Sequence, residues 1–195
     1  MHKYIVGLTG ASGIIYGIRL VEQLLVRSHE VHVVTSEAAS IVAKHEMGYD
    51  GESWLQKAIS PELQERLFIY DNSHISAIIA SGSFPNEGMI IVPSSMATIA
   101  GITVGNSRNL IERAADVTLK EKRRLIVVPR ETPLSSIHLK NLLALSNLGV
   151  HVIPAMPAFY HHPQSLDDMV NFVVGKIMDA LQIPHELFRR YEGMD

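Results

Sequence analysis

The chain has 195 residues, of which 47% are hydrophobic and 19% charged, and it contains no cysteine. This length and balance predict one globular domain, and the lack of cysteine excludes disulfides, thiolate metal sites and a thiol nucleophile. The formal net charge of −3 at pH 7 argues against a nucleic-acid partner. No apolar run reaches the roughly 18 residues of a membrane-spanning helix and no signal peptide is visible, so a cytoplasmic protein without membrane contact is expected.

The first predicted strand, around residues 4–6, runs into a turn of small residues at 7–13. An apolar-periodic helix follows over residues 14–27. Such a turn presents backbone N–H groups at a helix N-terminus, so it predicts an anion site, usually for phosphate. The glycine spacing differs from the dinucleotide fingerprint, and no P-loop lysine follows. A tight turn that needs its glycines only for packing is the alternative.

Strands and helices alternate along the rest of the chain. Further strands are predicted at 31–35, 67–70, 89–92, 125–128 and 151–153, and helices at 37–45, from 94–98 onward, and at 109–120, 136–147 and 166–181. Ser36 and Ser165 are expected as N-caps, and Gly149 as the residue that closes a helix. The pattern predicts an α/β fold, a doubly wound parallel sheet in a Rossmann- or flavodoxin-like three-layer sandwich. One domain would span residues 1–195, with a core at about 3–183 and a C-terminal tail at 184–195.

Ligands of such sheets bind beyond the carboxyl ends of the strands. Small hydroxyl-rich turns and one arginine fall at these ends, at residues 10–12, 36, 94–98, 130–131 and after 153. Hydroxyls and backbone amides bind phosphate and ring edges, and arginine adds a bidentate cation. The sequence therefore predicts a pocket for a phosphorylated, planar cofactor.

Several charged residues lie on the predicted helices. The spacing of Lys176 from the apolar residues before it places it on the core-facing stripe of the last helix. A charge there must either snorkel to solvent or meet an anion, and the pattern leaves both open. Glu46 and Lys120 each end an amphipathic helix. The spacing of Glu112, Asp116 and Lys120 favours solvated pairs four residues apart.

The loops carry further candidates. The Arg-Glu pair at 130–131 follows a buried strand and stands between two prolines, which favours a functional role at a ligand-facing rim. The two histidines at 161–162 are adjacent, which is poor chelating geometry, so no metal site is expected. Ser12 and Ser95 lack the nucleophile-elbow pattern, so hydrogen bonding is expected of both rather than nucleophilic attack.

Seven motifs carry a resemblance to a known family. They lie at residues 10–13, 81–83, 93–96, 109–117, 129–134, 137–139 and 157–161. With these motifs the chain resembles the UbiX-type flavin prenyltransferases from about residue 3 to about residue 183. It looks closest to the branch associated with phenolic-acid decarboxylases.

The resemblance implies transfer of a dimethylallyl group from dimethylallyl monophosphate to N5 and C6 of reduced FMN, with no metal ion. The product, prenylated FMN, would serve a separate UbiD-type decarboxylase. Family members commonly form dodecamers with the site between subunits, so a homo-oligomer is implied in which some site residues serve a neighbour's flavin.

The same resemblance assigns the site residues. FMN would be bound by Gly10, Ala11, Ser12, Ser36, Ser95, Met96, Ala97, Thr98 and Arg130. The prenyl phosphate would be held by Tyr160, Lys176 and Arg130. The catalytic set would be Ser12, Glu46, Lys120, Glu131, Tyr160 and Lys176. In these roles, cations and hydroxyls stabilise the departing phosphate, and Glu131 or that phosphate accepts the ring proton.

The chain departs from the family at three positions. Ser94 stands where cysteine is common, and Ile75 and Tyr191 align with tryptophans found in some members. The last two changes leave the length of the prenyl substrate open.

Two other functions are alternatives. A flavoprotein that decarboxylates a C-terminal or pantetheine-linked cysteine typically carries an Asn that is missing from residues 154–157 here. A non-catalytic FMN carrier that supports an aromatic acid decarboxylase would not need Glu131, Tyr160 and Lys176, whose presence therefore favours an enzyme.

Overall fold

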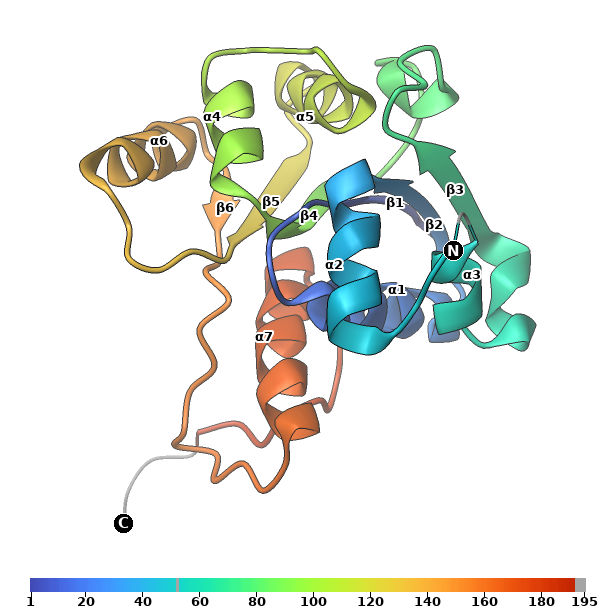
Figure 1. Cartoon of the computed structure of the whole chain (residues 1–195), viewed down its shortest axis with the longest axis vertical. Helices are drawn as coiled ribbons and strands as arrows, with labels where there is room; N and C mark the ends of the chain where they lie inside the picture. Colours follow the sequence, from blue (N-terminus) through green and yellow to red (C-terminus); the bar gives the residue numbers. More distant parts are fainter. Residues whose placement is uncertain (52, 192–195) are drawn as a thin grey trace.

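A six-stranded, fully parallel sheet forms the centre of the molecule in the computed structural model, which describes residues 1–51 and 53–191 (Figure 1). Its strands are β1 (Lys3–Leu8), β2 (Glu30–Thr35), β3 (Leu67–Asp71), β4 (Gly88–Ser94), β5 (Arg124–Pro129) and β6 (His151–Val152). Their spatial order is β3-β2-β1-β4-β5-β6. The chain winds outward from β1 to β3 and then crosses back to β4, which places the switch point between β1 and β4.

Helices cover both faces of the sheet (Figure 1). One face carries α1 (Ile14–Val26), α2 (Glu37–Met47), α3 (Trp54–Ala58) and α7 (Leu166–Leu181), with the short helix η1 (Pro61–Arg66). The other carries α4 (Met96–Thr103), α5 (Leu110–Lys120) and α6 (Ser136–Asn147), with η2 (Ile78–Ala80). The doubly wound α/β prediction is confirmed. The predicted tail extends to residue 195, and its last four residues lie outside the described part of the chain.

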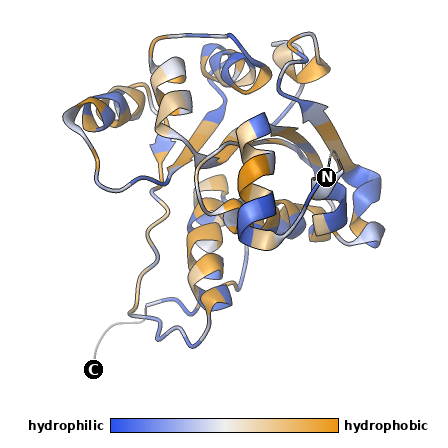
Figure 2. Ribbon diagram, in the orientation of Figure 1, coloured by the Kyte–Doolittle hydropathy of each residue, from blue (hydrophilic) through white to orange (hydrophobic). Residues whose placement is uncertain are grey.

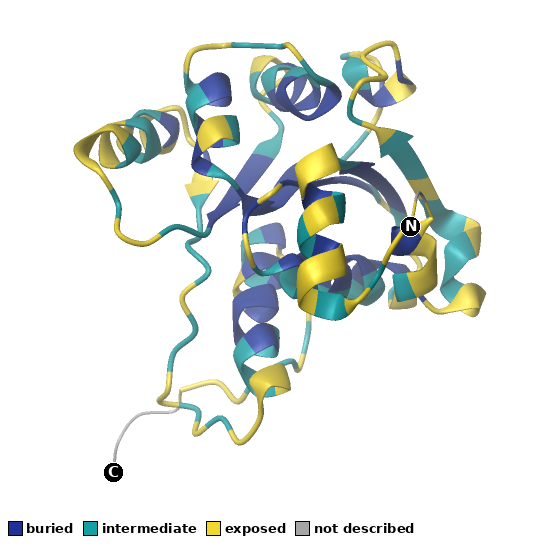
Figure 3. Ribbon diagram, in the orientation of Figure 1, coloured by how far each residue is buried: buried dark blue, intermediate teal, exposed yellow. Residues whose placement is uncertain are grey.

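The core consists of two apolar layers, one on each side of the sheet. Alternate side chains of a strand point to opposite faces, so Val6 and Ile90 pack with α1 and α7, while Ile5 and Ile91 pack with α4 and α5. Figures 2 and 3 show that the central strands are hydrophobic and buried along most of their length. Each fully buried Ile or Leu side chain contributes about 1.5–3 kcal/mol relative to an exposed one.

Gly17 lets α1 lie directly against the sheet. A Cβ atom at this position would lie 2.5 Å from the carbonyl oxygen of Val92 and 2.4 Å from Cδ2 of Leu8. Both distances are far below a normal contact, so any larger residue would push α1 away from β1 and β4.

The predicted caps are present at the helix ends. The Ser36 side chain accepts a hydrogen bond from the Ala39 N–H at 3.1 Å, and Ser165 accepts one from Asp168 at 3.2 Å. Gly149 closes α6 with a φ of 84°, a left-handed conformation that suits glycine. Local side-chain chemistry therefore sets these helix boundaries, as the sequence predicts. Among the described residues, no helix has the length and apolar character needed to cross a membrane.

The prediction that Lys176 faces the core is wrong. Its side chain is 49% exposed, while Val174 and Ile177 are completely buried. At 3.6 residues per turn, Lys176 lies about 160° around α7 from Val174, which is close to the opposite face. The ammonium group therefore needs no anion to remain charged, and it lies 3.8 Å from a carboxylate oxygen of Asp179.

The predicted pairing along α5 is also wrong. Asp116 pairs with Arg113 at 3.1 Å rather than with Lys120, and Lys120 lies 3.6 Å from Glu121. Glu112 is buried and accepts a hydrogen bond from the backbone N–H of Arg108, so it is not available on the solvent face.

Candidate active site

Three helix N-termini meet at the carboxyl edge of the sheet, because α1, α2 and α4 directly follow β1, β2 and β4. Thr9 connects two of these turns. Its hydroxyl donates to the carbonyl oxygen of Pro93 at 2.8 Å and accepts from the N–H of Ser95 at 2.8 Å. The small-residue turn before α1 therefore lies beside the start of α4. This arrangement places backbone N–H groups and the positive ends of three helix dipoles at one edge.

The N-terminus of α1 already binds an anionic group, the carboxylate of Glu46. The N–H of Gly13 lies 3.0 and 3.1 Å from its two oxygens, and the N–H of Ile14 lies 3.1 Å from one of them. Gly13 has a φ of 100° and no side chain with which to cap the helix, so a residue at the end of α2 supplies the acceptor. The amides predicted to hold a phosphate thus face a carboxylate of the same chain.

Gly10 has a packing role in the same turn. A Cβ atom at Gly10 would lie 2.4 Å from the Cβ of Ala38 in the first turn of α2. Glycine is required here so that the turn and α2 can approach closely, which keeps the packing interpretation valid beside the anion-binding one.

A pocket of about 450 Å³ opens beside this turn. It is lined by Ser12, Gly13, Ile15, Tyr16, Glu46, Arg130, Ala155, Leu166, Asp167, Met169 and Val170. The structure therefore brings together Ser12, Glu46 and Arg130, which are far apart in the sequence. Nε of Arg130 is buried and has no hydrogen-bond partner within the described residues. A buried donor of this kind needs an acceptor, which an anion in the pocket would provide.

Burial and, to a smaller extent, the negative charge of Glu46 raise the pKa of Tyr16. The phenol therefore keeps its proton at neutral pH and can donate a hydrogen bond inside the pocket.

The other predicted flavin contacts lie at the starts of α2 and α4. The Ser95 side chain accepts from the Thr98 N–H at 3.3 Å and lies 3.0 Å from the Thr98 hydroxyl. Ala97 is exposed, whereas Met96 is buried in the core beneath. At the rim, Glu131 accepts a hydrogen bond from the N–H of Thr132 at 3.0 Å.

Tyr160 and Lys176 form a second group that does not line this pocket. The Tyr160 ring meets Phe172 edge-on, with centroids 5.7 Å apart, and Lys176 follows Phe172 by one turn of α7. Tyr160 also meets Tyr191 edge-on at 5.9 Å. Tyr160 and Lys176 are thus both placed beside Phe172, whereas the third predicted prenyl-phosphate residue, Arg130, lines the pocket with Ser12 and Glu46.

Lys120 lies on the opposite side of the molecule. It ends α5, immediately before β5 begins, and so lies at the amino edge of the parallel sheet. Ser12 and Arg130 follow the carboxyl ends of β1 and β5. One chain therefore does not bring Lys120 to the pocket.

The pocket contains residues that sequence reasoning missed. Tyr16 lies in the first turn of α1, directly after the small-residue turn, and this position in the sequence could have indicated a place in the site. Leu166, Met169 and Val170 come from the first turns of α7 and form an apolar wall. No sequence pattern indicates that α7 begins beside α1, since this depends on the packing of the complete fold.

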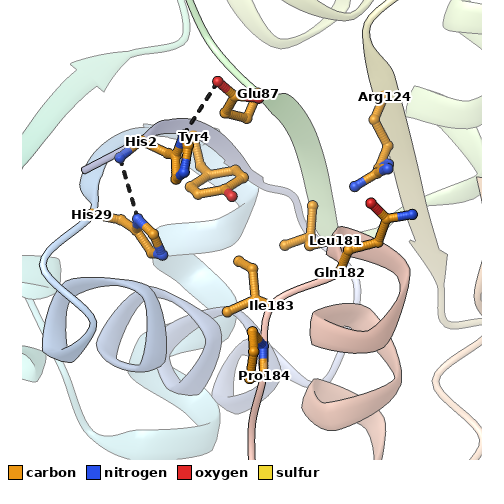
Figure 4. A pocket seen from close by; sticks show the side chains of 9 residues that line it. All are labelled: His2, Tyr4, His29, Glu87, Arg124, Leu181, Gln182, Ile183 and Pro184. Carbon is orange, nitrogen blue, oxygen red and sulfur yellow. Dashed lines mark hydrogen bonds and ion pairs between the residues drawn. The ribbon is translucent and has the colours of Figure 1, made fainter.

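A further pocket of about 450 Å³ lies at the amino edge, and none of the predicted site residues lines it. Figure 4 shows Tyr4 and Arg124 facing this pocket above Leu181 and Ile183. In it, the N–H of His2 donates to Nδ1 of His29 at 3.3 Å, and the His2 ring lies 3.3 Å from Glu87. No group of three or more His, Asp or Glu side chains in the described part of the chain is arranged to hold a metal ion.

Known proteins resemble this chain over nearly its whole length. A family model described as Flavoprotein matches residues 1–178. The flavin prenyltransferase LpdB of Lactiplantibacillus plantarum is 50% identical over 194 residues, which cover 99% of this chain and 100% of the relative. A dodecameric FMN-dependent UbiX-like decarboxylase from Escherichia coli O157:H7 has a TM-score of 0.89 at 43% identity, covering 98% of this chain and 100% of the other. AnUbiX (PadA1), solved in complex with FMN and dimethylallyl pyrophosphate, has a TM-score of 0.91 at 36% identity, covering 100% and 99%.

Proposed function

Because the chain belongs to the UbiX-type flavin prenyltransferases of the Flavoprotein family, we propose that it transfers a dimethylallyl group from dimethylallyl monophosphate to N5 and C6 of reduced FMN. The family model spans nearly the whole chain, which supports one flavoprotein domain. The product, prenylated FMN, is the cofactor of a separate UbiD-type decarboxylase, which is the proposed recipient.

The buried Nε of Arg130, which is unpaired among the described residues, gives this function its main structural support. The Arg130 side chain lines a pocket with Ser12, Glu46 and the start of α1. An arginine held in this way, beside polar groups on one side and an apolar wall on the other, fits a ligand with an anionic group and an apolar body.

The residues present fit FMN. The N-termini of α2 and α4 can receive its phosphate through backbone amides and the hydroxyls of Ser36, Ser95 and Thr98. We propose that the small-residue turn with Gly10, Ala11 and Ser12 lies against the flavin, that Met96 and Ala97 contribute backbone at the start of α4, and that Arg130 completes the set. Reduced FMN supplies the two nucleophilic ring atoms of the reaction.

The chain's own residues assist the departure of phosphate. Cleavage of the allylic C–O bond leaves the electron pair on the phosphate oxygen, and Arg130, Lys176 and the Tyr160 hydroxyl are donors that stabilise this charge. Ser12 adds a hydroxyl at the junction between the flavin and the prenyl group. N5 loses its proton when it is alkylated, and closure of the second bond at C6 then adds a proton to the prenyl double bond and removes the proton on C6. Glu131 or the departing phosphate carries these protons, accepting one and returning it to the double bond. Leu166, Met169 and Val170 exclude water from the allylic carbon.

A homo-oligomer would bring the separated groups together. Lys120 lies at the far edge of the sheet, and Tyr160 and Lys176 lie outside the Ser12–Arg130 pocket of one chain. The relative from E. coli is dodecameric. Helix α6 also exposes large apolar residues, namely Ile137, Leu139 and Leu143. Exposed apolar surface of this kind marks interfaces, so we propose a dodecamer in which neighbouring chains complete each site.

The deciding experiment is anaerobic incubation of the protein with reduced FMN and dimethylallyl monophosphate, with the pyrophosphate in a parallel reaction. We expect a flavin heavier by one prenyl unit. An unchanged flavin mass with FMN still bound would favour the carrier function. Cysteine decarboxylase activity would instead appear as loss of carbon dioxide from a peptide ending in cysteine.

The Lys176→Ala variant tests the proposed phosphate contact. We expect weaker binding of dimethylallyl monophosphate with FMN affinity unchanged, measured by titration of the FMN-bound protein. Lys57→Ala is the matched control, because Lys57 is an exposed lysine on α3 that lines neither group. Equal prenyl-phosphate binding by the two variants would remove Lys176 from the site.

A further inference from the structure

Asp179, in the last part of α7, gathers three basic side chains. Its carboxylate lies 3.8 Å from Nζ of Lys176, 3.1 Å from Nε2 of His185 and 2.8 Å from Nη2 of Arg190. The Asp179 side chain is only 26% exposed, and that of His185 is completely buried. Burial raises the pKa of Asp179, but hydrogen bonds from Arg190 and His185 outweigh this and hold the pKa below its usual value. The residue therefore stays charged and connects α7 to the chain segment that follows it.

That segment, residues 182–191, runs back along α7. Gly175 allows the contact, because a Cβ there would lie 2.5 Å from the Phe188 ring. Phe188 also packs on Phe172 with ring centroids 5.0 Å apart, and the Arg190 guanidinium lies 5.7 Å from the Phe188 ring centroid. The segment is thus held by one aromatic contact over a glycine and by two hydrogen-bonded ion pairs to Asp179.

The end of the segment reaches Tyr160. Tyr191 meets the Tyr160 ring edge-on at 5.9 Å, and Tyr160 in turn meets Phe172 at 5.7 Å. Asp179 consequently contacts Lys176 directly and contacts, through His185 and Arg190, the segment that carries Tyr191. Lys176 and Tyr160, two of the three proposed prenyl-phosphate residues, are therefore both connected to this one carboxylate.

We propose that Asp179 is a positioning residue for the prenyl-phosphate subsite, which holds Lys176 and the C-terminal segment together against Tyr160. This inference rests on the proposed function. Asp179 itself does not touch the substrate. Its effect is to keep the Lys176 ammonium group and the Tyr160 ring in one arrangement, so that neither has to be ordered again when the prenyl phosphate binds.

The test compares Asp179→Asn and Arg190→Gln with the wild-type FMN-bound enzyme. Asparagine keeps the shape but loses the charge, and Arg190 is exposed enough for its substitution to leave the fold intact. For both variants we expect KM for dimethylallyl monophosphate to rise about tenfold with kcat changed less than about threefold. Tryptic cleavage after Arg189 should become about fivefold faster or more, because the segment detaches. Glu186→Gln is the control, an exposed carboxylate on the same segment.

Each outcome has a defined consequence. Faster cleavage together with a raised KM supports the inference, and Asp179→Glu should then restore part of both. Cleavage unchanged from the Glu186→Gln control overturns it, as does faster cleavage with an unchanged KM. If the wild-type protein forms no prenylated flavin, the proposed function fails and the positioning role fails with it. If the wild type forms the product and the variants keep its KM and its cleavage rate, only the role of Asp179 is excluded.

Discussion

The contact between Glu46 and the start of α1 leads to a quantitative prediction. The carboxylate accepts two N–H groups that would otherwise lack an intrahelical partner, and its charge lies at the positive end of the helix dipole. A cap contributes about 0.5–2 kcal/mol, and a charge at an exposed helix end about 0.3–1 kcal/mol. Glu46→Ala should therefore cost about 1 kcal/mol, which corresponds to about 2–4 °C in melting temperature for a chain of this length. Glu46→Gln, which keeps one oxygen acceptor, should lose about half as much.

Calorimetry of the ligand-free protein measures this effect, with Glu65→Gln as the control for loss of an exposed carboxylate. Inorganic phosphate adds a second readout. In Glu46→Ala the amides of Gly13 and Ile14 are open, so millimolar phosphate should stabilise this variant more than the wild type. A variant that melts with the wild type, or equal stabilisation of both by phosphate, would refute the assignment of Glu46 as the anion that caps α1.

Two further predictions concern stability. Gly17→Ala should destabilise the protein by about 2 kcal/mol in urea unfolding, because overpacking against Val92 and Leu8 exceeds the gain of about 1 kcal/mol in helix propensity. A variant as stable as the wild type would contradict the close approach of α1 to the sheet. Burial lowers the pKa of His32 despite the adjacent Glu30. As the pH drops below about 6.5, the His32 ring is protonated in the unfolded chain before it is protonated in the folded one, so the free energy of unfolding should fall. His32→Gln should reduce that slope without abolishing it, since burial also lowers the pKa of His29, and an unchanged slope would exclude His32 as a contributor.

The regular elements could be predicted because their determinants are local. Buried strands are continuously apolar, and Ser36, Ser165 and Gly149 mark helix ends through interactions within a few residues. The parallel order of the strands follows from the alternation of strands and helices. The placement of Ser12 and Arg130 at one edge follows in turn from that order.

What could not be predicted depends on contacts distant in sequence. Glu46 reaches Gly13 across 33 residues, and only the packing of α2 against the turn reveals it. The periodicity of α7 predicts the wrong face for Lys176 because two different parts of the chain pack against this helix. The sheet covers the side with Val174, and the C-terminal segment covers Phe172 and Gly175. Apolar residues therefore surround much of the helix, and their periodicity no longer identifies one buried stripe.

The convergence of three helix N-termini has an evolutionary consequence. The positive potential at this edge comes from peptide groups, whose orientation is fixed by the order of strands and helices rather than by side-chain identity. Substitution of a hydroxyl or a cation around the pocket can change which bond is made or broken. The contribution of the peptide dipoles to phosphate binding therefore lasts as long as this order of strands and helices does. Proteins that share this sheet can therefore evolve from one reaction to another while they keep the dipole contribution to cofactor binding.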